Sequence, residues 1–115
     1  MVIRTEKERR QAQRIFAGSD PAYSAMGVSG ITTATVELTP LMVDRTTGKL
    51  KVWDGWNAGT AVGVLALPVD GTESTLTYWK SGTFATEALN WPNNVDAVKK
   101  ANAFAGSAIS HVALP

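Results

Sequence analysis

The sequence predicts a mainly β fold, α+β at most, in which short strands and long irregular segments form one compact domain with a β-barrel or clip-like arrangement. Three observations support this prediction. The chain has 115 residues, which is enough for a single domain. From residue 36 onward, short segments of alternating apolar and polar residues are separated by turn residues. Only one segment, near 94–105, has the sequence features of a short helix.

The N-terminal segment differs from the rest of the chain in charge. Residues 1–14 contain five basic and two acidic side chains, a net charge of +3, whereas residues 15–115 contain six basic and eight acidic ones, a net charge of −2. Residues 4–14 are good helix formers, but no apolar stripe runs along them, so a helix there would not dock on a core. We therefore expect residues 1–16 to form a flexible arm and residues 17–115 to form the folded domain.

The predicted elements follow the arm in order. Residues 17–35 consist mainly of Ala, Gly, Ser and Thr and predict a long irregular segment. Strands are predicted at 36–39, 41–43, 49–53, within 61–69, and at 75–79 and 107–114. Pro40 is expected to separate the first two, residues 44–48 to form a hairpin loop, and residues 80–83 to end a strand. Asn93 or Asn94 is the predicted helix cap, and Gly106 is the residue expected to follow the helix.

The sequence holds few of the groups that catalysis or metal binding requires. It has no cysteine, which excludes disulfides, thiolate zinc sites, iron–sulfur centres and a cysteine nucleophile. His111 is the single histidine, and its neighbour Ser110 would point to the opposite face of a strand, so the two do not form a catalytic pair. The ten carboxylates show no spacing that singles out an acid–base pair. No cofactor or metal is predicted, and a small hydrolase using Ser110, His111 or two carboxylates is kept only as an alternative.

Composition and charge also bear on two classes of partner. No run of about 18 apolar residues is present, and residues 1–8 lack the apolar segment of a signal peptide, so no membrane partner is expected. The basic arm could contact nucleic-acid phosphates, but Glu6 and Glu8 interrupt its charge and the body is acidic. A protein-docking arm is favoured, with a nucleic-acid-binding domain as the alternative.

Bulky apolar residues next to polar segments indicate possible contacts. Ile15 and Phe16 follow the polar arm and could anchor it either to the body or to a partner. Trp56 lies in the turn at 55–59, where it is either an exposed contact residue or folded back over the core.

A series of short motifs is spread across the whole chain. They are Ser19-Asp20-Pro21-Ala22, Thr39-Pro40-Leu41-Met42, Trp53-Asp54-Gly55, Leu76-Thr77-Tyr78-Trp79-Lys80-Ser81-Gly82-Thr83-Phe84, Trp91-Pro92, Lys99-Lys100 and Ala103-Phe104-Ala105-Gly106. In this order and spacing, between residues 15 and 110, the chain resembles the head decoration proteins of lambda-type bacteriophages. The resemblance implies a compact, mainly β fold with little helix and a structural, non-enzymatic role.

The resemblance also implies partners and a location. Members of the family form homotrimers on the outside of the phage head, at three-fold positions, after the shell has expanded, and they brace it against the pressure of packaged DNA. They are late proteins that lie on the outer surface of the virion and in the host cytoplasm during assembly, without direct contact with nucleic acid. Their N-terminal arm pairs with the major capsid protein.

Carried over to this sequence, the resemblance predicts two sets of contact residues. The arm would join a sheet of the major capsid protein by strand addition between Thr5 and Phe16. Its capsid-binding residues are predicted to be Thr5, Arg10, Arg14, Ile15 and Phe16. The candidates for contact with trimer neighbours or the capsid are Asp20, Pro21, Met26, Val28, Ile31 and Trp56. Met26, Val28 and Ile31 are chosen because they would otherwise face water.

Overall fold

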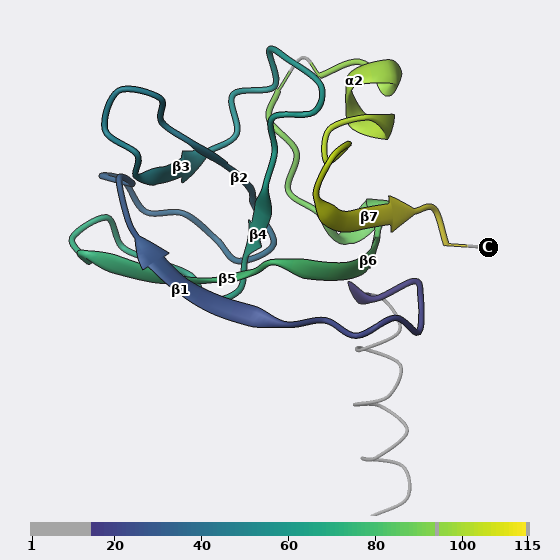
Figure 1. Ribbon diagram of the computed structural model, residues 1–115, viewed down its shortest axis with the longest axis horizontal. Helices are drawn as coiled ribbons and strands as arrows, with labels where there is room; N and C mark the ends of the chain where they lie inside the picture. The colour runs from purple at the N-terminus through teal and green to yellow at the C-terminus, as the bar shows by residue number, and fades with distance from the viewer. Residues whose placement is uncertain (1–14, 94, 115) are drawn as a thin grey trace, which may run out of the picture.

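The computed structural model describes residues 15–93 and 95–114. The regular elements in this part of the chain are mostly short strands (Figure 1). The strands are β1 (Ser24–Val28), β2 (Pro40–Val43), β3 (Leu50–Val52), β4 (Gly63–Leu65), β5 (Thr75–Trp79), β6 (Ser81–Ala85) and β7 (Ala108–Val112). The helical elements of this part of the chain are the 3-10 helix η1 (Thr86–Ala88) and the helix α2 (Ala97–Ala101). The predicted mainly β fold is confirmed.

The strands form two sheets that remain open. In the first, antiparallel neighbours follow the order β1-β5-β4-β2-β3, and in the second β6 and β7 run parallel. β6 continues the line of β5 beyond Lys80 and so leaves the first sheet to join the second (Figure 1). The edge strand β3 meets the chain just after β1 only at a single bridge between Ser29 and Leu50, so the first sheet does not close. The barrel part of the prediction is therefore wrong.

Two clusters of buried side chains lie on opposite faces of the five-stranded sheet, because side chains alternate between faces along each strand. The loop cluster, which irregular segments cover, consists of Ile31, Leu41, Leu50, Leu65, Val69 and Leu76. The aromatic cluster consists of Trp53, Ala61, Val64, Phe84, Leu89, Ala103, Phe104 and Ile109. Its members from Phe84 onward come from β6, β7 and the segments around α2, which cover this second face.

Several predicted elements are confirmed where local chemistry defines them. The loop at 44–48 is a hairpin loop, in which the Asp44 carboxylate accepts hydrogen bonds from the backbone N–H groups of Thr46 and Thr47 at 2.8 and 3.2 Å. β5 has the predicted bounds. β3, β4 and β7 lie inside the predicted ranges 49–53, 61–69 and 107–114, each shorter than expected.

Three local predictions are wrong. Residues 36–39 form a turn, because the Thr39 hydroxyl donates to the Val36 carbonyl at 2.8 Å and Leu38 has a φ of 64°. Pro40 then begins β2 instead of separating two strands, a position where its missing N–H costs no ladder bond. The segment 17–35 contains β1, which pairs along its whole length with β5. The prediction that residues 80–83 end a strand is confirmed at Lys80, which follows the last residue of β5, but Ser81 already begins β6.

The predicted helix is present but shorter than expected. Its N-cap is Asp96, whose carboxylate accepts from the Lys99 backbone N–H at 2.8 Å, instead of an asparagine at 93 or 94. The C-cap is Asn102, so Gly106, with a φ of 92°, lies in a later turn and not directly after the helix.

Two tryptophans three positions apart lie in different environments, one in the core and one on the surface. Trp53 is fully buried and its Nε1 donates to Thr60 Oγ1 at 2.9 Å, whereas Trp56 is 74% exposed. Trp53→Ala is expected to lower the free energy of unfolding by roughly 3–5 kcal/mol, because it opens a cavity and leaves Thr60 without this donor. Trp56→Ala should change it by less than about 0.5 kcal/mol. Denaturant unfolding followed by circular dichroism measures both, and equal losses would contradict this placement of the core.

Candidate functional site

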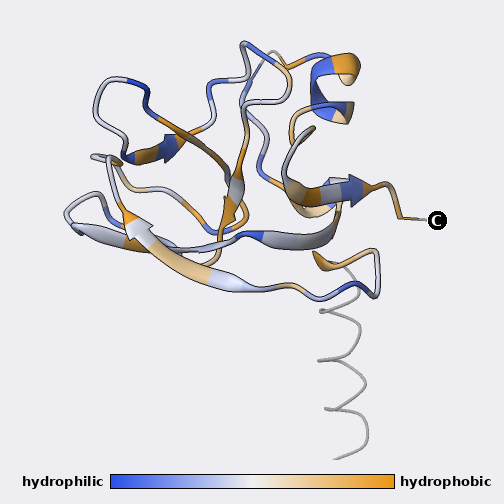
Figure 2. Ribbon diagram, in the orientation of Figure 1, coloured by the Kyte–Doolittle hydropathy of each residue, from blue (hydrophilic) through white to orange (hydrophobic). Residues whose placement is uncertain are grey.

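An uncharged, exposed surface lies where β1 forms the edge of the first sheet. Met26 and Val28 are 69% and 56% exposed and stand opposite Thr77 and Thr75 of β5. Paired residues share a face of a sheet, so these four side chains form one surface, which we call the β1 face. The hydropathy of β1 rises towards its end (Figure 2). Isolated exposed apolar residues are ordinary, but neighbours on an unpaired edge strand favour an interface.

The turn that precedes β1 is held in place by the start of β6. Asp20 and Pro21, two of the candidate contact residues, are exposed. Ser81 Oγ donates to the Pro21 carbonyl at 3.2 Å and accepts from the Tyr23 backbone N–H at 2.9 Å. The turn and the β1 face are therefore consecutive along one edge of the molecule.

The remaining candidates of the second set do not join this edge. Ile31 is only 6% exposed and belongs to the loop cluster, so the expectation that it faces water is wrong. The sequence does not predict the burial of Ile31, because this burial depends on the pairing of β1 with β5. Trp56 is exposed, but it lies in the loop between β3 and β4, at the opposite end of the molecule from residues 15–20 (Figure 1).

Ile15 and Phe16 lie against the body of the same chain. Both are partly buried against the aromatic cluster. The Phe16 ring contacts Trp79 edge-on, with centroids 5.6 Å apart, and Phe84 at 5.0 Å, while the Ala17 N–H donates to the Thr83 carbonyl at 3.0 Å. Thr5, Arg10 and Arg14 lie outside the described residues. The sequence left open whether Ile15 and Phe16 anchor to the body or to a partner. In the free chain, both pack against the body.

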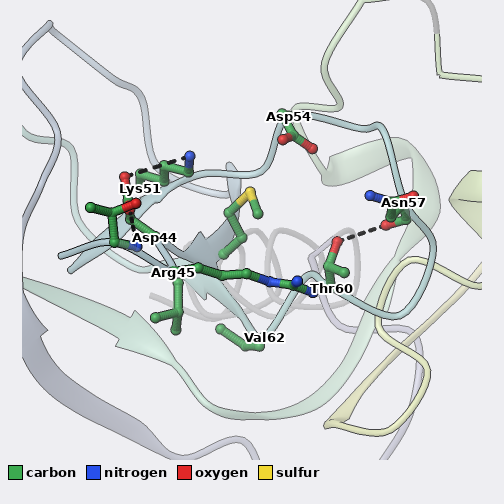
Figure 3. A pocket seen from close by; sticks show the side chains of 10 residues that line it. Asp44, Arg45, Lys51, Asp54, Asn57, Thr60 and Val62 are labelled. Carbon is green, nitrogen blue, oxygen red and sulfur yellow. Dashed lines mark hydrogen bonds and ion pairs between the residues drawn. The ribbon is translucent and has the colours of Figure 1, made fainter. Parts of the chain in front are cut away.

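A groove of about 600 Å³ lies between the β2–β3 hairpin and the loop before β4 (Figure 3). The Arg45 side chain extends along it towards Thr60, and Lys51 forms an ion pair with Asp44 at 3.7 Å. The backbone N–H groups of Thr46 and Thr47, with Lys51 beside them, hold the pKa of the Asp44 carboxyl below its ordinary value. Sequence reasoning missed this groove, because its walls come from two loops whose juxtaposition no local pattern encodes.

The groups considered for catalysis serve structural contacts. His111 is partly buried, and its Nε2 donates to the Lys100 carbonyl at 2.6 Å while Nδ1 meets Thr86 Oγ1 at 2.7 Å. Ser110 Oγ instead bonds Thr83 Oγ1 at 2.8 Å, which confirms that the two neighbours face different ways. In residues 15–93 and 95–114, no three His, Asp or Glu side chains gather as metal ligands, and no helix has the length and apolar character to cross a membrane.

Comparison with known proteins identifies the family. The family model of the bacteriophage lambda head decoration protein D matches residues 5–112. The chain belongs to this family. The head decoration protein of Enterobacteria phage P21 is 65% identical over 115 residues, covering 100% of both chains. A putative decoration protein of Escherichia phage N15 is 50% identical over 98 residues, which are 84% of this chain and 89% of the relative.

Membership of the lambda decoration protein family confirms the resemblance predicted from the short motifs. It makes the protein a structural component of the phage capsid and places it in the virion. The family is one of structural proteins, in agreement with the structural contacts that Ser110 and His111 make. The functional surface of this protein is thus expected to be one that contacts other proteins of the capsid.

The position of Phe16 gives a prediction for the free protein. Phe16→Ala is expected to lower the free energy of unfolding by roughly 1–3 kcal/mol, since it removes contacts with Trp79 and Phe84. Removal of residues 1–14 should leave that free energy within about 0.5 kcal/mol. Denaturant unfolding of both variants is the measurement. An unchanged free energy of unfolding in Phe16→Ala would mean that Ile15 and Phe16 are part of the N-terminal arm and do not stabilise the body.

Proposed function

We propose that the protein binds as a homotrimer to the outside of the expanded phage head, at three-fold positions, and stabilises the shell against the pressure of packaged DNA. The observation that carries the proposal is the β1 face, an uncharged apolar surface on the edge of a protein of the lambda decoration family. Its partners are a second copy of the chain and the major capsid protein. Assembly takes place in the host cytoplasm, where decoration follows expansion of the shell.

The β1 face has the chemistry of a protein contact. Met26 and Val28 each contribute up to about 1.5–3 kcal/mol when fully removed from water. Thr75 and Thr77 beside them add no charge that would have to be desolvated. Asp20 and Pro21 lie on the turn leading into this surface and would form its polar rim.

The second contact is made by residues 1–14, which add to a sheet of the major capsid protein. Strand addition draws its affinity from backbone hydrogen bonds, so it suits a segment without an apolar stripe. Phe16, which follows this segment in the sequence, is held against the body beside Trp79 and Phe84. Ordering the segment costs about 1–2 kcal/mol per residue, so a single arm binds weakly and three arms in a trimer bind by avidity. The arms engage together only when the capsid sites have the correct spacing, which links binding to expansion.

Removal of residues 1–14 tests the arm. The truncated protein is expected to keep its fold and its oligomeric state in solution, because residues 15–93 and 95–114 contain both core clusters. It is expected to lose binding to expanded shells. Co-sedimentation with expanded and unexpanded shells is the measurement. Undiminished binding of the truncated protein would contradict the arm proposal.

The salt dependence of the same binding separates the proposal from the nucleic-acid alternative, which rests on the net charge of +3 in residues 1–14. Binding through phosphate contacts weakens steeply as salt rises, whereas sheet addition with apolar contacts does not. A steep loss, together with binding of free DNA, would favour the alternative.

The β1 face gives a separate prediction. Met26→Lys places a charge on this face and is expected to abolish trimer formation or shell binding while leaving the monomer folded, since Lys is tolerated on edge strands. Leu67→Lys is the matched control, because Leu67 is also largely exposed but lies outside the β1 face. Mass in solution and co-sedimentation with shells report both effects. Equal behaviour of the two variants would exclude the β1 face as a contact.

A further inference from the structure

Trp56 is a large apolar side chain that the fold does not use. It is 74% exposed and, among the described residues, its ring makes no aromatic contact and its Nε1 no hydrogen bond. Trp53 and Trp91, in contrast, pack against each other and donate from Nε1 to Thr60 Oγ1 and the Thr86 carbonyl. An indole left in water forgoes one of the largest burial energies available to a side chain.

The loop that carries Trp56 is nevertheless rigidly held. The Asp54 carboxylate accepts from the Trp56 N–H at 3.0 Å, and Thr60 Oγ1 donates to the Asn57 carbonyl at 2.7 Å while it accepts from buried Trp53. Gly55 has a φ of 76°, and a Cβ there would come within 2.5 Å of Val95 Cγ2. The N–H of Gly59 also bonds the Asn102 carbonyl at 2.8 Å. The indole is thus presented by a preorganised turn, which reduces the entropy cost of binding.

Polar side chains surround the exposed ring. Trp56 lines an open cavity of about 340 Å³ together with Asp54, Gly55, Asn93 and Lys99. Within the described part of the chain, the Asn93 amide and the Lys99 ammonium form no hydrogen bond or ion pair. The cavity therefore offers an amide, an ammonium and the second oxygen of the Asp54 carboxylate around one aromatic platform.

We propose that this cavity binds a sugar ring of a saccharide. The C–H groups on one face of a pyranose form an apolar surface that stacks on an indole, and its hydroxyls both donate and accept hydrogen bonds. Asp54 accepts, Lys99 donates and Asn93 does both, so the cavity matches the two properties at once. A protein partner would instead favour an apolar surface around the tryptophan.

The place of the cavity fits a ligand outside the phage head. The β3–β4 loop and α2 lie at the opposite end of the molecule from residues 15–20 (Figure 1). If the N-terminal side faces the shell, Trp56 faces outward, where saccharides of a cell surface are within reach. This orientation rests on the proposed function, whereas binding of a sugar by the free protein does not.

The experiment titrates the free, full-length protein with the methyl glycosides of glucose, galactose, mannose and N-acetylglucosamine, followed by ¹⁵N–¹H NMR. The chain has four tryptophans, so four indole N–H signals are expected, and the one missing in Trp56→Phe is that of Trp56. At least one glycoside should shift this signal and the Asn93 side-chain amide, with an affinity in the millimolar range that a small ligand in an open site reaches.

Variants make the result specific. Trp56→Ala should weaken binding at least about tenfold, and Trp56→Phe less, because it keeps an aromatic face. Asn93→Ala should also weaken it, while Val98→Ala, a largely exposed position on α2 outside the cavity, should not. No shift of the Trp56 signal with any glycoside in the unmodified protein, or an undiminished shift of the Asn93 side-chain amide in Trp56→Ala, would overturn the proposal. Undiminished shell binding by the truncated protein, which would contradict the proposed function, would leave this result unaffected.

Discussion

The short strands set the constraint on which the rest of the structure depends. The strands of the described chain have three to five residues, so at about 3.3 Å per residue each face of the sheet offers only a few positions for burial. One cluster on one face would be too small a core. The chain therefore buries side chains on both faces, with loops over one and the β6–β7 sheet with its neighbouring segments over the other. The irregular segments are part of the core and not additions to it.

This division also determines which surface stays open. β6 leaves the first sheet after Lys80, so the second layer covers Val64 and Trp79 but does not extend to the far end of β5. Met26 and Val28, opposite that end, consequently remain exposed. At the covered end, Phe16 completes the ring contacts of Trp79 and Phe84 and so holds the first described residues against the body. The two contacts proposed for assembly are products of the same packing.

The sequence predicted what local patterns encode. The alternation of residues 75–79 and the Asp44 hairpin loop are determined by neighbouring residues, and both were foreseen. β1 was not, because its Ala, Met and Gly residues become a strand only through pairing with β5, which also buries Ile31 nearby. Gly27 has a role that no local pattern shows, since a Cβ there would come within 2.5 Å of Leu50 Cδ1. Of the candidate sites, exposure of Trp56 was one of two open alternatives, and the groove beside Arg45 was missed.

Trp53 and Trp56 show why residue type alone does not separate core from surface. Gly55 stands between them, and its positive φ turns the chain so that one indole enters the aromatic cluster and the other leaves it. The buried ring then stabilises the exposed one indirectly, because Trp53 donates to Thr60, and Thr60 closes the turn at Asn57. Rigidity at the surface is thus supplied from the core, at the end of the molecule opposite residues 15–20. A fold with its two contact regions at opposite ends can engage a shell on one side and present a fixed aromatic ring on the other.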